Sequence, residues 1–191
     1  MTLAQHSAVT VQHGTPPMFL EMGRRVLGGE YDLDPASSGY WNGHHVRAAR
    51  FIDEVEDGLK ADWRVVPGMR IICNPPGDGL VAPFFQRCVE AWRAGAGVWW
   101  VGFSLEQLAY LQDDGALDRW HTRVIPRRRI DFLAVATVPS AQPSLFGDIA
   151  PDAPRLQGSP THANYLLLMS SGQDAHGRLK AEAAAMRCET F

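Results

Sequence analysis

The sequence is poor in cysteine, in basic charge and in long apolar runs. Its three cysteines (Cys73, Cys88 and Cys188) are scattered and lack CxxC spacing. This argues against a disulfide framework or a zinc knuckle and predicts reduced thiols. Lysine and arginine number 18 against 21 acidic residues, a formal net charge of −3. The balance argues against a polycationic coat for nucleic acid, but it is compatible with a local basic groove because phosphate affinity follows patches.

No stretch has the character of a membrane span or of a secretory leader. The longest apolar run, AGAGVWWVGFSL (94–105), is too short and too rich in glycine to cross a bilayer. The first residues, MTLAQHSAVTVQHG, lack a basic start and a long apolar segment. Together with the reduced thiols, these features predict a cytoplasmic protein without a membrane partner.

The sequence holds enough apolar material for one domain with a substantial core. It has 191 residues, of which 46% are hydrophobic and 20% charged, the balance of an ordinary globular domain. We expect a flexible arm over residues 1–14, one domain over 15–171, and a C-terminal helix or tail over 172–191.

Strand-like and helix-like segments alternate along this domain. The expected helices cover residues 18–29, 81–95, 104–115 and 177–191, and Thr15-Pro16-Pro17 supplies a cap and a first turn for the first of them. The expected strands cover 30–37, 69–76, 97–103, 128–136 and 163–171, with a short apolar segment at 122–126. This alternation predicts an α/β fold with a mostly parallel sheet and helices on both faces. A Pro/Ser/Gly-rich loop without a helix joins the last two strands, which predicts an antiparallel pair at one end.

Two strand-end turns carry polar chemistry. Asp34-Pro35-Ala36 and Asn74-Pro75-Pro76 each follow an expected strand, and ligands of such sheets bind where strands end, so both turns are expected at one cleft. The two prolines have no N–H to donate and hold the backbone extended, which leaves their carbonyls and the Asn amide oxygen as fixed acceptors. Acceptors of this kind can aim an exocyclic amine at a methyl donor. An ordinary strand-to-loop turn is the alternative interpretation.

These turns belong to an ordered set. Thr15-Pro16-Pro17, Asp34-Pro35-Ala36, Asp57-Gly58-Leu59 and Asn74-Pro75-Pro76 follow one another along the chain. Their order resembles that of the S-adenosylmethionine-dependent amino methyltransferases of DNA. The stretches DLDPA (32–36), DGLKADW (57–63), CNPPG (73–77) and RRIDF (128–132) narrow the likeness to the phage-type, Dam-like adenine-N6 methyltransferases. The resemblance covers roughly residues 13–170.

The resemblance implies a Rossmann-like methyltransferase fold and a site-specific enzyme that transfers a methyl group from S-adenosylmethionine to adenine N6 in DNA. In the family the (E/D)-P-A turn holds the methionine part of the cofactor, and a later Asp contacts its adenine. The cofactor-binding residues that this implies are Thr15, Pro16, Asp34, Pro35, Ala36, Asp57, Gly58, Leu59 and Asn74, and the catalytic segment is Asn74, Pro75, Pro76 and Gly77. No metal is expected. If a bacteriophage encodes the chain, the expected location is the host cytoplasm.

The sequence departs from the family first at Gly77. The family has an aromatic residue there, which stacks on the flipped base, and a flipped base still needs such a face. Phe84, Phe85, Trp41 or Tyr40 could supply it. Gly77 also leaves open a cytosine-N4 methyltransferase on the same fold. A catalytically silent protein that keeps the fold and binds DNA or a partner is the other alternative.

Two further departures concern the cofactor. The family at large has an extra strand, a helix and an acidic ribose ligand between the counterparts of Pro35 and Asp57, and this chain has only a short segment there. Its candidates for the ribose ligand are Asp53, Glu54 and Glu56. The loop SSGYWNG (37–43) stands in place of the usual glycine-rich cofactor loop.

Four other features each have a functional and a structural interpretation. Arg127, Arg128 and Arg129 are candidates for contacts with DNA phosphates, or are an exposed strand start. Gln142-Pro143-Ser144-Leu145-Phe146 resembles the peptides that dock on the replicative sliding clamp. His44-His45 lacks partners at metal-site spacing and is read as a polar turn. Trp99-Trp100 is read as core, with one ring near the cofactor as the alternative.

Overall fold

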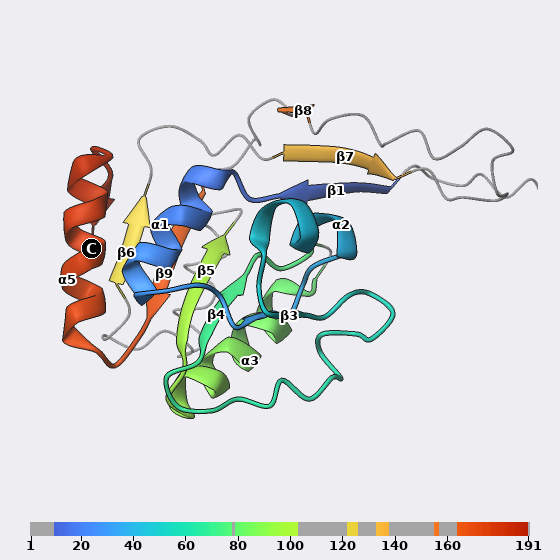
Figure 1. The fold of residues 1–191 in the computed structure, drawn as a ribbon, viewed down its shortest axis with the longest axis horizontal. Helices are drawn as coiled ribbons and strands as arrows, with labels where there is room; N and C mark the ends of the chain where they lie inside the picture. The colour runs from blue at the N-terminus through green and yellow to red at the C-terminus, as the bar shows by residue number, and fades with distance from the viewer. Residues whose placement is uncertain are drawn as a thin grey trace, which may run out of the picture.

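The computed structural model describes residues 10–77, 79–102, 122–125, 133–137, 155–156 and 164–190 (Figure 1). Its main element is a seven-stranded sheet with the order β10-β6-β9-β5-β4-β2-β3. These strands are β2 (Leu33–Asp34), β3 (Arg50–Phe51), β4 (Arg70–Cys73), β5 (Gly97–Gly102), β6 (Thr122–Ile125), β9 (Tyr165–Met169) and β10 (Glu189–Thr190). A three-stranded sheet joins β1 (Thr10–Gly14), β7 (Leu133–Thr137) and β8 (Arg155–Leu156).

The main sheet is mostly parallel. Strand β2 pairs in parallel with both β3 and β4, and β4 pairs in parallel with β5. Strand β9 lies between β5 and β6 and runs antiparallel to both, while β10 runs antiparallel to β6. The α/β class, the mostly parallel sheet and the presence of antiparallel strands toward one end therefore follow the expectation from the sequence.

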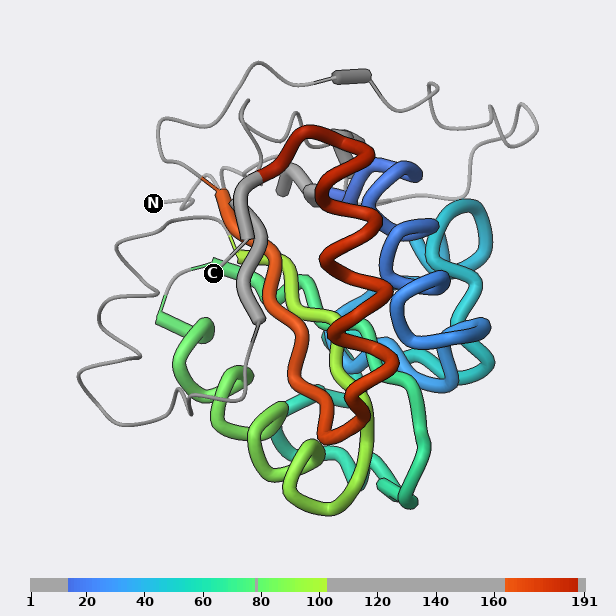
Figure 2. The backbone as a smooth tube through the Cα atoms, turned by 90° about the vertical axis from the view of Figure 1, so that its left-hand side faces the viewer, coloured from blue at the N-terminus to red at the C-terminus, as the bar shows by residue number. Residues whose placement is uncertain are grey.

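Helices cover both faces of this sheet. Helix α3 (Val81–Arg93) packs in one apolar cluster with Ile71 and Trp100. Helices α1 (Pro17–Leu27) and α5 (Gln173–Ala185) share the other cluster with Ile72 and Trp99. Consecutive strand residues fall into opposite clusters because their side chains point to opposite faces. Figure 2 shows α5 alongside α1. Both tryptophans are fully buried, which confirms them as core residues.

The strand expected at 128–136 has different neighbours from those predicted. Its described part, β7, pairs with β1 and β8 rather than with β9. All five residues of β9 are buried, and a strand covered on both faces belongs in the interior of a sheet, where β5 and β6 flank it. The expected pairing of the last two strands is wrong. An apolar pattern predicts that a strand is buried, but it does not predict which strands lie beside it.

Several element boundaries also differ. The last five residues of the expected arm form β1. Helix α1 has Pro16 at its N-cap and makes no side-chain cap hydrogen bond, so Thr15 is not the cap. Between β2 and β3 the expected loop contains α2 (Gly39–Trp41) and a π-helical turn, η1 (Asn42–Val46). Helix α5 ends at Ala185 and β10 follows it. The helix expected at 104–115 lies outside the described residues.

Among the residues that the structure describes, no helix is long and apolar enough to cross a membrane.

Candidate functional site

A cavity of about 720 Å³ lies where β2 and β4 end. Its wall combines the end of β1 (Gly14 and Thr15) with the segments that follow β2 (34–39), β3 (52–55) and β4 (74–77). Parallel strands end at the same edge of a sheet, so the fold itself brings these segments together. A volume of this size suits a ligand as large as a nucleoside.

The turn after β2 contributes a buried carboxyl group. Asp34 is only 4% exposed, and its Oδ1 accepts a hydrogen bond from the backbone N–H of Ala36 at 3.1 Å. The backbone of Asp34 also accepts from the N–H of Ile52 at 2.9 Å, which ties the turn to the segment after β3. Burial raises the pKa of Asp34 to about 6, although the hydrogen bond from Ala36 acts in the opposite direction. A hydrogen bond with the Ser37 side chain also lowers the pKa of Asp34, but no cationic side chain lies beside it on the described cavity wall.

The charge of the cavity wall has one sign. Asp34, Asp53 and Glu54 line it, and no lysine, arginine or histidine does so among the described residues. A phosphate-bearing nucleotide would meet repulsion here, whereas a ligand with an ammonium or sulfonium centre, or with hydroxyl donors, would be stabilised. The wall therefore favours a cationic or hydroxyl-rich ligand.

The segment after β4 forms another part of the wall. Asn74 is half-buried and Pro75 is buried, while Pro76 and Gly77 are exposed. Four strand residues pair β4 in parallel with β5 up to Cys73, so Asn74 leaves the sheet at its ligand-binding edge. A Cβ atom at Gly77 would meet nothing within 4 Å in the described structure, and Gly77 is not among the glycines with positive φ. The described structure therefore leaves open space at residue 77, where the family that the sequence resembles has an aromatic residue.

Gly58 joins two of the predicted motifs directly. A Cβ atom there would lie 1.9 Å from the carbonyl oxygen of Pro35 and 2.9 Å from the Phe84 ring. Only glycine lets the 57–59 turn pack this closely under the turn after β2. The Asp-Gly pair and the Asp-Pro-Ala turn thus meet at van der Waals contact.

The other residues of that motif make contacts elsewhere. Asp57 binds Lys60 at 2.7 Å and accepts from the backbone N–H of Leu59 at 3.0 Å, and the hydrogen bond with Lys60 lowers the pKa of Asp57. Neither Asp57, Leu59 nor Pro16 is part of the cavity wall. The cavity wall therefore contains Thr15, Gly58 and the turns at 34–36 and 74–77. It does not contain Pro16, Asp57 or Leu59.

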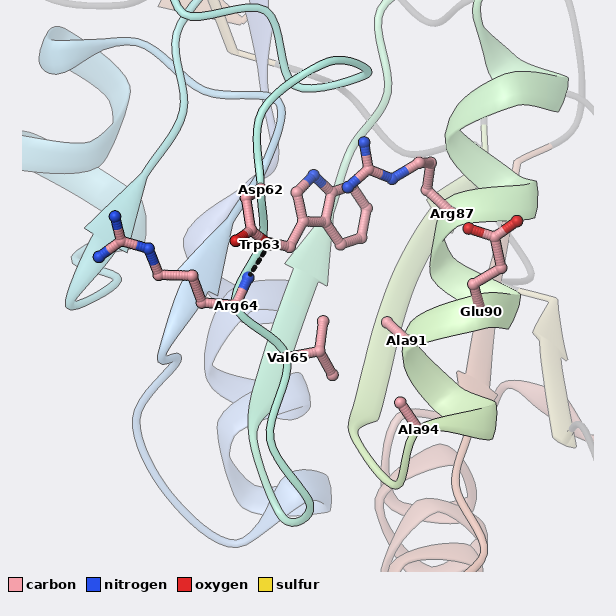
Figure 3. A pocket seen from close by; sticks show the side chains of 8 residues that line it. All are labelled: Asp62, Trp63, Arg64, Val65, Arg87, Glu90, Ala91 and Ala94. Atoms are coloured by element: carbon pink, nitrogen blue, oxygen red, sulfur yellow. Dashed lines mark hydrogen bonds between the residues drawn. The ribbon is translucent and has the colours of Figure 1, made fainter.

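A clamp on the far side of the 57–63 turn holds it in place. The indole N–H of Trp63 donates to the carbonyl of Gly58 at 2.7 Å. Arg87 of α3 lies over the Trp63 ring (Figure 3), 4.6 Å from its centroid. It also donates to the carbonyls of Leu59 and Ala61. A shallow hollow of about 210 Å³ next to this clamp is lined by the same two side chains. Because the Arg87 guanidinium is already bound to the backbone and to the Trp63 ring, we interpret the hollow as a gap between packed elements and not as a ligand site.

The structure separates the four aromatic candidates for a base-stacking face. Trp41 and Phe84 line the cavity. Phe85 is fully buried against Trp100 at 5.1 Å between ring centroids, and Tyr40 stacks on His44 outside the wall. Trp41 packs on the backbone of Gly14, where a Cβ atom would come within 2.3 Å of its ring.

The three acidic candidates for a ribose ligand also separate. Asp53 and Glu54 line the cavity, whereas Glu56 binds Arg50 at 2.9 Å. Asp53 is fixed, because its Oδ1 accepts from the backbone N–H groups of Val55 and Glu56, each at 3.0 Å. His44 and His45 belong to no group of metal-ligating side chains in the described part of the chain.

Some site residues had no signal in the sequence, and others cannot be placed. Gly14, Val46 and Ile52 line the cavity; of these, only Gly14 had a cue, since it directly precedes Thr15. The predicted DNA contacts at 127–129 lie outside the described residues. So does the segment at 142–146, which resembles peptides that bind the sliding clamp.

Comparison with protein-family models, with curated proteins and with solved structures finds no match to this chain. Its function must therefore be argued from the site.

Burial of Asp34 predicts a stability effect with a definite sign. Its pKa is raised from 3.8 to about 6 in the folded protein, so the buried charge costs stability at neutral pH and nothing below the unfolded pKa. Asp34→Asn should raise the free energy of unfolding above pH 6 by up to roughly 3 kcal/mol, and the gain should vanish as the pH falls toward 4. Denaturant titrations at several pH values measure it.

Asp32, one residue before β2, is the matched control. It binds Arg70 at 3.0 Å, and the hydrogen bond with Arg70 lowers its pKa. Asp32→Asn should destabilise the protein at pH 7, and its effect should fade as acid protonates the wild-type carboxylate. A loss of stability in Asp34→Asn at pH 8 would contradict the assignment of Asp34 as a destabilising buried charge.

Proposed function

We propose that this protein transfers a methyl group from S-adenosylmethionine to the N6 amino group of adenine in DNA. The observation that carries the proposal is the shared cavity. An Asn-Pro-Pro segment and a buried, unneutralised Asp-Pro-Ala turn reach the same wall from neighbouring parallel strands. The order of the motifs in the sequence indicated these two turns. An α/β fold in general does not require a buried carboxyl group and an Asn-Pro-Pro segment in the same cavity.

The residues of the cavity fit this cofactor by charge. Bound S-adenosylmethionine supplies an electrophilic methyl group on a cationic sulfur and carries an ammonium group. Asp34, which is buried and has no basic neighbour on the described wall, would bind the positive methionine end. Asp53, already oriented by two backbone N–H groups, or the exposed Glu54 would accept hydrogen bonds from the ribose hydroxyls.

The Asn74-Pro75 segment would prepare the nucleophile. An exocyclic amine has its lone pair delocalised into the base ring, so it is a weak nucleophile in the free base. The Asn74 side-chain oxygen and the Pro75 carbonyl would accept hydrogen bonds from its two N–H groups and draw the lone pair out of conjugation with the ring. The nitrogen would then attack the methyl carbon directly while the methyl–sulfur bond breaks, so that the cofactor would leave as the neutral thioether S-adenosylhomocysteine. One N–H proton would pass to solvent after the new N–C bond forms. This route needs no covalent intermediate between protein and base.

The alternative within the same chemistry is methylation of cytosine N4. It is favoured by one observation, the open space at Gly77, because no ring there selects the size of the base. A silent protein of this fold would differ from both by lacking affinity for the cofactor.

Label transfer distinguishes these functions. The protein is incubated with tritiated S-adenosylmethionine and unmodified DNA, and the digested nucleosides are separated. We expect label in N6-methyladenine. Asn74→Ala should reduce the rate of label transfer by at least about 100-fold, because it removes one of the two acceptors of the amine. Label in N4-methylcytosine would establish the alternative. No label in any nucleoside from protein that binds the cofactor would contradict both.

Restoring a ring at the open position should improve the reaction. Gly77 is exposed, has room for a side chain and needs no left-handed backbone, so Gly77→Tyr should fold normally. A tyrosine there could stack on the flipped base, and we expect kcat/KM for DNA to rise by about ten-fold. Gly177→Tyr is the control, because Gly177 is equally open but lies on α5. An unchanged rate in a Gly77→Tyr variant of unchanged melting temperature would show that the base does not stack at residue 77.

A further inference from the structure

A series of rings leads from the cavity wall to the surface through α2 and η1. Trp41 lines the cavity, and the ring of His45 lies 4.9 Å from it. Tyr40 meets Trp41 edge to face at 5.4 Å and stacks on His44 at 4.6 Å, with 26° between the ring planes. We call Tyr40 and His44 the ring stack. Since His44 is exposed and Tyr40 is half-buried, His44 is its outer ring.

The segment formed by α2 and η1 is held in place by hydrogen bonds within residues 40–48. The Asn42 side chain donates to the carbonyl of Ala48 at 3.1 Å and accepts from the Ala48 N–H at 2.9 Å. The Nδ1 atom of His44 lies 2.9 Å from the carbonyl oxygen of Tyr40. A carbonyl only accepts, so Nδ1 carries the proton in this contact and the imidazole is fixed in its stacked orientation. An exposed ring fixed in this way loses little conformational freedom when a ligand stacks on it.

The surroundings of the ring stack favour a flat, anionic polymer over a peptide. Residues 35–52 contain no Asp or Glu, although the chain as a whole has 21 acidic residues. Arg47 directly after η1 is 65% exposed, and its guanidinium forms a solvent-exposed ion pair with the carboxylate of Glu21 at 3.6 Å. Gly43 beside His44 leaves open space. None of the exposed large apolar side chains of the described residues (Met18, Val55, Val66 and Leu80) belongs to this turn, so it offers no apolar groove for a peptide.

We propose that the ring stack is a docking surface for an unpaired nucleobase that flanks the base entering the cavity. The base would stack on the outer face of His44 and extend the Tyr40–His44 pair, and Arg47 would approach the neighbouring phosphate. Stacking of this kind accepts any base because every base has a π-face. The identity of the reacting base rests on the proposed function, but the stacking surface is tested without any methyl transfer.

The test is fluorescence anisotropy with a labelled single-stranded DNA of mixed sequence. We expect His44→Ala to weaken binding by about ten-fold, the range of one base–aromatic stack, and His44→Phe to keep it within about two-fold. Wild-type protein should bind an abasic strand of the same length about as weakly as His44→Ala binds the normal strand. His176→Ala is the matched control, because His176 on α5 also lies against a backbone carbonyl, that of Ser170 at 2.8 Å, and should leave affinity unchanged.

Three results would overturn the inference: equal affinity of wild type and His44→Ala, equal loss in His44→Phe and His44→Ala, or equal affinity for abasic and normal strands. Melting curves establish that each variant is folded. Calorimetry with S-adenosylmethionine and the label-transfer assay report on the proposed function separately. Loss of strand binding on removal of His44 in a protein that transfers no methyl group would therefore support the ring stack and contradict only the enzyme.

Discussion

The site depends on one electrostatic constraint, a carboxyl group buried at the end of β2 without a buried cation beside it in the described structure. Asp34 receives a hydrogen bond from Ala36, but burial still raises its pKa to about 6. Such a group lowers the free energy of unfolding of the ligand-free protein. Destabilising groups of this kind are typical of binding sites, where a ligand of opposite charge stabilises them. The acidic wall formed with Asp53 and Glu54 extends the same preference for a positive or hydroxyl-bearing ligand.

The rest of the fold holds this carboxyl group and the Asn-Pro-Pro segment in one place. Parallel pairing of β2 with β4 sets the two turns side by side. Gly58 lets the 57–59 turn close under Pro35, and Arg87 with Trp63 fixes that turn from the side away from the cavity. Asp34 and Asn74 line the cavity, whereas Trp63 and Arg87 hold the backbone of the turn that contains Gly58.

The sequence was sufficient for features that depend on local pattern. Strand β4 and helix α3 were predictable because Ile71, Ile72 and Cys73 form a short buried run and the next segment repeats its apolar residues at helical spacing. Convergence of Asp34 and Asn74 followed from the geometry of parallel strands. Features that depend on distant partners were not predictable, and the pairing of β1 with β7 is one of them. The π-helical turn η1 and the ion pair of Asp57 with Lys60 are local, but the sequence pattern did not indicate either conformation. The choice of Trp41 and Phe84 over Phe85 likewise needed the orientation of α3.

The most direct test of this account is the pKa of Asp34 itself, measured by carbon-13 NMR titration of its side-chain carboxyl with and without S-adenosylmethionine. We predict a pKa of about 6 in the free protein and a clear fall of that pKa when the cationic ligand binds, because a nearby positive charge favours the carboxylate. A pKa that stays near 6, or rises, in protein saturated with the ligand would contradict the role given to Asp34.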